Sequence, residues 1–255
     1  MAVVASGAGV LEWGSERARA GPWRADGRTA YLTPLQGGRG VGAPSAAFLR
    51  HCLDRLARDG YERVITSALP GHERRAFEAA GFTELEELVV LRHDLTGLAP
   101  RAWAPRAGGA GAGAPGGVRV RRGGAQDHAR VVALDTLAFR RFWQLDAVGL
   151  LEAIGATSSA RFRVAEVDGE VVAYAVTGRS HHHGYLQRLA VDPLHRRRGL
   201  GRTLVVDALR WLRRRGASEA AVNTQPDNHA ALDLYRRLGF RPDAKGLWVL
   251  QADLG

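Results

Sequence analysis

The chain has 255 residues, 45% of them hydrophobic, which is enough to bury a sizeable core in one large or two modest domains. Its formal net charge is +10, but the arginines are spread along the whole chain, which favours solvated helix faces over a nucleic-acid surface. The single cysteine, Cys52, excludes an internal disulfide, and no cysteine–histidine cluster has metal-ligand spacing, so we expect a cytoplasmic protein without a metal site. We expect neither an export signal nor a membrane span, because no basic segment precedes an apolar one and no run reaches about 18 apolar residues.

The chain divides at residues 99–117, a segment made almost entirely of Ala, Gly and Pro. Such a composition cannot bury enough apolar surface to offset its ordering entropy, so it is typical of a linker. We therefore predict a first domain over residues 1–98 and a second over residues 118–255. In the first domain, apolar residues in helical register predict a helix over residues 45–58, followed by a strand over residues 63–66.

The second domain alternates between strand and helix patterns. A strand is predicted over residues 118–122, helices over 126–139 and 142–154, and two strands over 161–167 and 171–177, joined at Asp168-Gly169 by a strong hairpin signal. A strand over 185–191, a helix over 200–214, a strand over 218–224, a helix over 228–238 and a strand over 247–254 follow. We expect an α/β (α+β) fold with a mixed, mostly antiparallel sheet flanked by helices.

Short segments near the end of each domain resemble one another. RHDL, ending at Leu95, matches QADL, ending at Leu254, and AAGF around Gly81 matches RLGF around Gly239 at nearly the same spacing. These matches predict an internal repeat. The alternative is a chance similarity between two amphipathic helices and two strands, because matches this short are common.

The segment LQRLAVDPLHRRRGLGRTL, residues 186–204, runs from a strand through a glycine-bearing loop into a helix. The first amides of a helix have no internal partner and carry partial positive charge, so they attract anions. Gly199 and Gly201 remove side chains that would hold a phosphate away, and Arg197, Arg198 and Arg202 add charge. The pattern indicates a diphosphate site, with an ordinary tight turn among solvated arginines as the alternative.

A second signal is NTQPDNHAALDLYRRLGF, in which Asn228 and Tyr235 lie on one helix face about two turns apart. An amide and a phenol would then line one groove. The alternative is structural, with Asn228 as a helix cap and Tyr235 as a core aromatic.

LAVDPLHRRRGLGR and NHAALDLYRRLGF together resemble the cofactor-binding half of the GNAT superfamily of N-acetyltransferases, and the resemblance covers residues 118–255. It implies a catalytic GNAT domain that uses acetyl-CoA as acyl donor. It also implies that Asn228 contacts the pantetheine and that Tyr235 faces the thioester sulfur. Two further segments would bind the cofactor: a stretch of strand backbone that meets the acetyl and pantetheine groups, and a loop that wraps the pyrophosphate. The stretch comprises Leu189, Ala190 and Val191, and the loop comprises Arg197, Arg198, Gly199, Leu200, Gly201 and Arg202.

The chemistry agrees with these roles. A backbone amide near Leu189 or Val191 can stabilise the charge that builds on the thioester oxygen, and a phenol of pKa about 10 can protonate a thiolate whose thiol pKa is about 8.5. Tyr235 is therefore the candidate general acid. The identity of the general base stays open. Family members that use a carboxylate on the strand before the Asn228 helix would have it near Asn223, and this sequence has no acid there. Glu166, Asp146 and residues 181–183 (three histidines) are the candidates, while a water chain or an amine that arrives already neutral would need no dedicated base.

We expect an N-acetyltransferase acting on a primary amine of a protein N-terminus, a lysine or a small molecule, with Trp143 and Asp146 placed by the resemblance at the acceptor pocket. A non-catalytic acyl-CoA sensor is the alternative. The first domain resembles the degenerate copy of tandem GNAT proteins, because Phe77 takes the place of Tyr235 and Pro70 that of Asn228, and its glycine run 37–42 has one arginine. We expect it to be truncated and to lack the early strands and helices.

Overall fold

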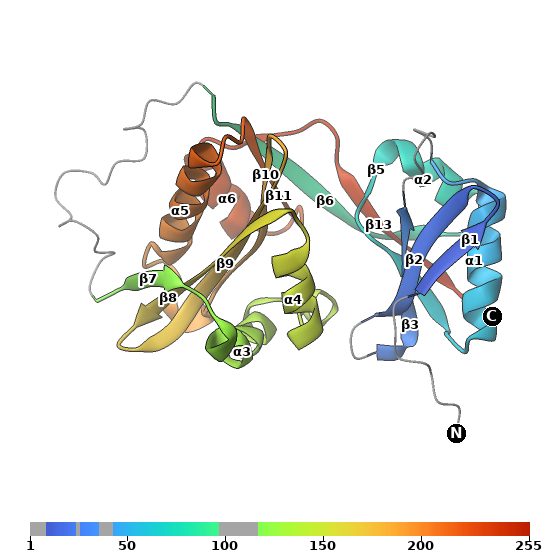
Figure 1. Cartoon of the computed structure of the whole chain (residues 1–255), viewed down its shortest axis with the longest axis horizontal. Coiled ribbons are helices and arrows are strands. Elements are labelled where there is room, and N and C mark those ends of the chain that lie inside the picture. The colour runs from blue at the N-terminus through green and yellow to red at the C-terminus, as the bar shows by residue number, and fades with distance from the viewer. Residues whose placement is uncertain (1–8, 24–25, 36–42, 97–116) are drawn as a thin grey trace. The chain divides into compact units, whose positions relative to one another are not determined.

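The computed structural model describes residues 9–23, 26–35, 43–96 and 117–255. These residues form two compact units (Figure 1). Unit 1 comprises Met1–Val90, Asn223–Asp227 and Asp243–Gly255, and unit 2 comprises Leu91–Val222 and Asn228–Pro242. The glycine run at 37–42 and nearly all of the linker predicted over 99–117 lie outside the described residues. None of the helices in the described ranges combines the length and the apolar character that a bilayer crossing requires.

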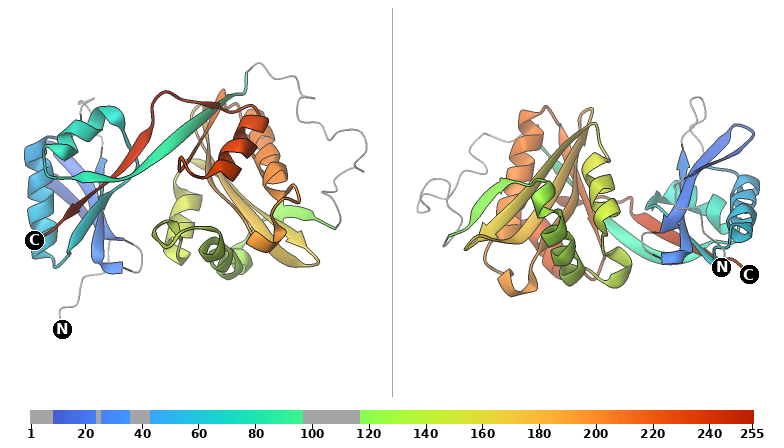
Figure 2. Two further views of the ribbon diagram at one scale, coloured as in Figure 1. Left: turned by 180° about the vertical axis from the view of Figure 1, so that it is seen from behind. Right: turned by 60° about the horizontal axis from the view of Figure 1, so that its bottom comes forward.

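Unit 1 is an antiparallel meander continued by a parallel strand, with one long helix on its face (Figure 2). Four buried side chains of this helix pack into the core of the unit. The Ser45 hydroxyl caps the helix by accepting from the Phe48 amide at 3.1 Å. The elements of the unit are β1 (Gly9–Trp13), β2 (Glu16–Trp23), β3 (Asp26–Leu35), α1 (Ala46–Arg58), β4 (Arg63–Thr66), β5 (Leu69–Pro70), α2 (Gly71–Glu78) and most of β6 (Thr83–Asp94).

The last strand of the chain, β13 (Leu247–Asp253), completes the sheet of unit 1 (Figure 1). It lies between β4 and β6 and pairs antiparallel with both. Leu250 and Ala252 join the same core as the α1 residues Phe48 and Leu49. The domain boundary predicted at the linker assigns this strand to the second domain instead. The sequence cannot show the difference, because alternation along a strand identifies its buried face but not the strands that pair with it.

Unit 2 is a mixed sheet in the order β6-β11-β10-β9-β8-β7, with helices on both faces (Figure 1). Two helices, α3 and α4, pack on the face of the sheet that carries Phe162, Val164 and Tyr174. Helix α5 packs against β8, β9 and β10, and its Asp207 forms an ion pair with Arg161 on β8. The expected mixed, mostly antiparallel fold is confirmed. The elements are β7 (Arg119–Arg122), α3 (His128–Ala138), α4 (Ala147–Gly155), β8 (Ser159–Val167), β9 (Glu170–Ser180), β10 (His183–Val191), α5 (Leu200–Arg214), β11 (Glu219–Thr224), α6 (His229–Arg237) and β12 (Arg241–Pro242).

One predicted element differs from the structure. The helix expected over residues 142–154 is divided into a 3-10 turn, Arg141–Trp143, and α4, which begins after Asp146. Asp146 caps α4 by accepting from the Gly149 amide at 2.7 Å. The break has a tertiary cause, because the Leu145 amide donates to a carboxylate of α3 instead of continuing a helix.

The two units repeat the order strand, helix, parallel strand, helix. Gly81 and Gly239 both have a positive φ directly after α2 and α6. The next residue in each unit, Phe82 or Phe240, then packs its ring against the helix residue at the equivalent position, Phe77 or Tyr235. This shared geometry supports an internal repeat over chance similarity.

The expectation that the first domain lacks its early strands is wrong. Strands β1 and β2 precede β3 as β8 and β9 precede β10. They were not predicted because the alternating residues 17–20 bury only alanine, which is depleted in strands, and glycine and proline follow. Among the described residues of unit 1, it is the counterparts of β7, α3 and α4 that are missing.

Candidate functional site

The parallel strands β10 and β11 pair only where they begin. Their register runs from His183↔Glu219 to Tyr185↔Ala221, and no later pair joins them within the described residues. On its other side β10 stays paired with β9 as far as Val191. The backbone of Leu189, Ala190 and Val191 therefore continues beyond the ladder on the β11 side, where a ligand can approach it, although the Val191 carbonyl accepts from the Arg196 guanidinium at 3.4 Å.

A bulge lies within β10 just before this open stretch. The register with β9 shifts between Leu186 and Arg188, so Gln187 is the extra residue. A bulge bends its strand and re-aims the residues that follow it. The divergence of β10 from β11 is thus built into the strand itself.

The loop after β10 turns the chain sharply into α5. Asp192 accepts from the Leu194 amide at 2.9 Å, and Arg197 and Gly199 both have left-handed backbone, with φ of 64° and 80°. Gly199 is the N-cap of α5, and no side chain caps this end of the helix. The predicted loop arginines, Arg197, Arg198 and Arg202, are all exposed. An uncapped helix start with three guanidinium groups beside it is suited to a polyanion.

Gly201 marks the place where three elements meet. A Cβ on this residue would lie 3.2 Å from the Leu234 side chain of α6 and 3.8 Å from the Val191 side chain of β10. The start of α5, the end of β10 and the face of α6 therefore converge. Leu200 is buried, so only its backbone is available to a ligand. The loop and strand stretches predicted as one binding region are brought together here.

The two predicted residues of α6 have structural roles as well. Asn228 is the N-cap, and its side chain accepts from the Ala231 amide at 3.3 Å. Tyr235 is buried, with its ring 5.5 Å from that of Phe240. Burial raises the pKa of the Tyr235 phenol above its ordinary value, so the hydroxyl keeps its proton at neutral pH. A proton donor must be protonated before the reaction, and Tyr235 meets that condition.

A buried ion pair that the sequence reading missed joins α3 to β10. Asp135 is fully buried and accepts two hydrogen bonds from the Arg188 guanidinium, each of 2.8 Å. It also accepts from the Leu145 amide at 2.7 Å and from the Tyr174 hydroxyl. The only signal in the sequence is an aspartate within an apolar helix and an arginine within an apolar strand.

The same guanidinium holds the segment between α3 and α4. Arg188 donates to the Trp143 carbonyl at 2.5 Å and lies 3.5 Å from the centre of the Phe139 ring. Arg188 directly precedes Leu189 in β10. The segment with Trp143 and Asp146, where the resemblance places the acceptor pocket, is therefore attached to the strand that carries the predicted acetyl-binding residues.

The candidates for a general base are dispersed. Asp146 is engaged as the α4 cap, and Glu166 accepts from the Arg121 guanidinium at 2.6 Å. His181 and His182 lie at the turn between β9 and β10, and His183, the first residue of β10, is 2.7 Å from Glu219. At roughly 3.4 Å per residue the strand separates His183 from Leu189 by about 20 Å, so these histidines are too far from the predicted acetyl position.

Comparison with known proteins agrees with this geometry. The fold is similar to that of a tandem GNAT protein from the clavulanic acid biosynthesis pathway, at a TM-score of 0.71 and 17% identity over 94% of this chain and 79% of that one. A GCN5-related N-acetyltransferase from Kribbella flavida matches with a TM-score of 0.64 and 18% identity over 99% of this chain and 91% of the other. At these identities the matches concern the fold.

The sequence relationship lies in unit 2. Residues 129–240 match the Acetyltransferase (GNAT) family. Mycothiol acetyltransferase from Nocardia farcinica is 41% identical over 59 residues, which is 23% of this chain and a fifth of that protein (20%). Residues 129–240 of unit 2 therefore form a GNAT acetyltransferase domain.

Proposed function

We propose that unit 2 transfers acetyl from acetyl-CoA to a primary amine of a protein N-terminus, a lysine or a small molecule. The observation that carries the proposal is the divergence of β10 from β11 beside the uncapped start of α5. A pantetheine chain, which has amide groups of its own, can then continue the open edge of β10 at Leu189 and Val191, while Arg197, Arg198 and Arg202 neutralise the diphosphate. Gly201 allows close packing of α5 against α6 beside this site, since a Cβ there would lie 3.2 Å from the Leu234 side chain.

In this proposal the residues of the chain divide the chemical work. The backbone at Leu189 and Val191 donates to the thioester oxygen, where negative charge builds during attack by the amine. Tyr235 donates a hydrogen bond to the departing thiolate and stabilises its charge as the C–S bond breaks. With a thiol pKa of about 8.5 the thiolate is a weaker base than the phenolate, so full transfer of the Tyr235 proton is uphill, and burial, which raises the pKa of the phenol, makes it more so. Asn228, beyond capping α6, contacts the pantetheine.

The acceptor is proposed to bind beside the segment that Arg188 attaches to β10. Trp143 lies in this segment, and its carbonyl accepts from Arg188. The similarity to mycothiol acetyltransferase over 59 residues is a reason to include small-molecule amines among the acceptors tested. We place the enzyme in the cytoplasm, because its one cysteine is a buried free thiol, as expected in a reducing compartment.

The test is a screen of the full chain with acetyl-CoA and amines of the three acceptor classes, following release of free thiol. At least one class should release thiol faster than hydrolysis alone. Tyr235→Phe should keep the affinity for acetyl-CoA and lower turnover by ~10²-fold or more, because the ring still packs while the donor is lost. Tyr185→Phe, at an exposed position of β10, is the matched control and should leave turnover unchanged.

Two outcomes would contradict the proposal. Silence of every acceptor class while acetyl-CoA still binds would favour the non-catalytic acyl-CoA sensor. Unchanged turnover of Tyr235→Phe under conditions where chemistry limits the rate would remove the role of Tyr235 but not that of the cofactor site.

A further inference from the structure

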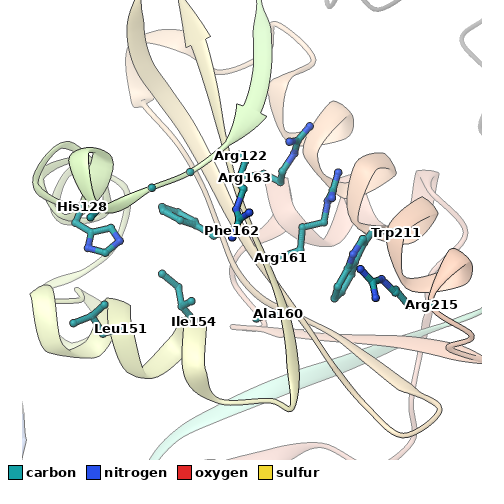
Figure 3. Close-up of a pocket in the computed structure, with 13 residues that line it drawn as sticks. Arg122, His128, Leu151, Ile154, Ala160, Arg161, Phe162, Arg163, Trp211 and Arg215 are labelled. Atoms are coloured by element: carbon teal, nitrogen blue, oxygen red, sulfur yellow. The ribbon is translucent and has the colours of Figure 1, made fainter.

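A pocket of about 430 Å³ lies at the β8 edge of unit 2, and residues that line it are drawn in Figure 3. Its walls come from the loop after β7, from α4, from β8 and from the end of α5. Strand β7 pairs with Arg163–Glu166 of β8 and leaves the start of β8, including Ala160, at the edge of the sheet. In the order β11-β10-β9-β8, two strand spacings, or about 10 Å, separate β8 from β10.

One wall of the pocket is strongly basic. Four arginines line it, and no lining residue carries a carboxylate. Arg161 and Arg163 share a single acidic partner, Asp207, at 2.8 and 3.3 Å. The other two, Arg122 and Arg215, are exposed at the rim (Figure 3). Positive charge therefore exceeds negative charge at this wall, which favours an anion.

The arrangement of the arginines shows that the basic wall is only partly compensated by Asp207. Arg122 and Arg163 are direct cross-strand partners, and like charges in this position repel each other. The Arg163 Nε is buried and has the shared Asp207 carboxylate, 3.3 Å away, as its ion-pair partner. Burial also lowers the pKa of Arg163 below its ordinary value. An anionic group in the pocket would relieve the repulsion between these guanidinium groups.

The opposite wall is apolar. Phe162 points to the other face of the sheet, with its ring 5.9 Å from that of His128 (Figure 3). Ile154 and Leu151 of α4 continue this wall, and the Leu151 side chain is 54% exposed. An exposed leucine at the mouth of a basic pocket is suited to the hydrocarbon part of a ligand.

We propose that this pocket binds an organic anion, a carboxylate or phosphate that carries an apolar chain, at a site separate from the acyl-CoA site. The guanidinium groups of Arg122, Arg163 and Arg215 hold the anionic head, since their planar forks match carboxylate and phosphate oxygens. The hydrocarbon part lies against Phe162, Ile154 and Leu151. This inference does not depend on the proposed acetyl transfer.

The experiment is a calorimetric titration of the full chain with octanoate and with octyl phosphate, in the presence of saturating CoA. One molecule of at least one probe should bind per chain, and the tighter of the two identifies the head group. The double variant Arg122→Met/Arg215→Met should weaken binding at least about tenfold, because two charge-assisted contacts are lost. Both arginines are exposed, so the variant should fold.

The matched control is Arg119→Met/Arg214→Met, which removes two exposed arginines from the same two elements without touching the lining. It should bind as the unchanged protein does. The proposal is overturned by any of four results: no saturable binding of either probe, loss of binding when CoA is added, equal weakening in the two double variants, or inorganic phosphate binding as tightly as octyl phosphate.

Discussion

Replacing Asp135 by leucine tests whether the ion pair with Arg188 holds unit 2 together. The change removes the acceptor of two guanidinium bonds, of the Leu145 amide and of the Tyr174 hydroxyl. The Arg188 side chain is only 11% exposed, so the charge that remains has little access to water. Breaking a buried pair by removing one partner costs about 3–5 kcal/mol.

The lower end of that range applies here. Arg188 retains the Trp143 carbonyl and the Phe139 ring, which partly compensate its charge. For a protein of this size each kcal/mol lowers the unfolding midpoint by about 2–4 °C, so about 3 kcal/mol corresponds to roughly 6–12 °C. We therefore expect the midpoint of thermal unfolding of the full chain to fall by that amount.

A second variant separates the unpaired charge from simple loss of packing. Asp135→Leu combined with Arg188→Met replaces the whole pair by apolar side chains, and such replacements are often neutral or stabilising. The double variant should therefore be more stable than Asp135→Leu alone. Asp233→Leu is the control, because this carboxylate is 57% exposed and lies 3.8 Å from Arg237, a surface pair worth at most about 1 kcal/mol.

The reasoning fails if Asp135→Leu shifts the midpoint no more than Asp233→Leu does. It also fails if the double variant is less stable than the single one, since the cost would then come from packing rather than from the unpaired guanidinium.

Three further predictions follow from the other parts of the structure. Gly201→Asp should severely weaken acetyl-CoA binding, because it adds a negative charge at the proposed diphosphate site and a Cβ 3.2 Å from the Leu234 side chain. If the folded variant bound acetyl-CoA with the affinity of the unchanged protein, the assignment of the diphosphate site would be wrong. Unit 1 should bind no acyl-CoA, because Phe77 and Pro70 stand where unit 2 has the phenol of Tyr235 and the amide of Asn228. A fragment of residues 1–98 should fold poorly, because it lacks β13. Binding of two acetyl-CoA molecules per chain, or a stable fragment that binds CoA, would contradict this. Burial raises the pKa of Cys52 to about 12, so alkylation of the thiol at pH 8 should be ~10²-fold or more slower than in the denatured chain. The free energy of unfolding should fall as the pH rises above about 8.5 toward 12, because the unfolded chain loses the thiol proton first. Equal labelling rates in the folded and denatured chains would show that the thiol is accessible.

The sequence alone determined the features that depend on neighbours along the chain. The helix over residues 200–214 has the same bounds in the structure, because its apolar stripe and the glycine before it are local signals. The hairpin at Asp168-Gly169 is confirmed by a positive φ at both residues. The loop and helix that carry the predicted cofactor residues could be recognised for the same reason, since Gly199 and Asn228 mark helix starts by their own chemistry.

Only the tertiary structure decided which distant segments pair. The alternation of β13 predicted a strand, but its position between β4 and β6 depends on an apolar face buried against α1, almost two hundred residues earlier in the chain. The divergence of β10 from β11 depends on a bulge that no local residue pattern announces. The division of the helix predicted over 142–154 depends on Asp135, whose carboxylate captures the Leu145 amide. Each of these outcomes is set by contacts between residues far apart in sequence, because a side-chain pattern encodes which face is buried but not what buries it.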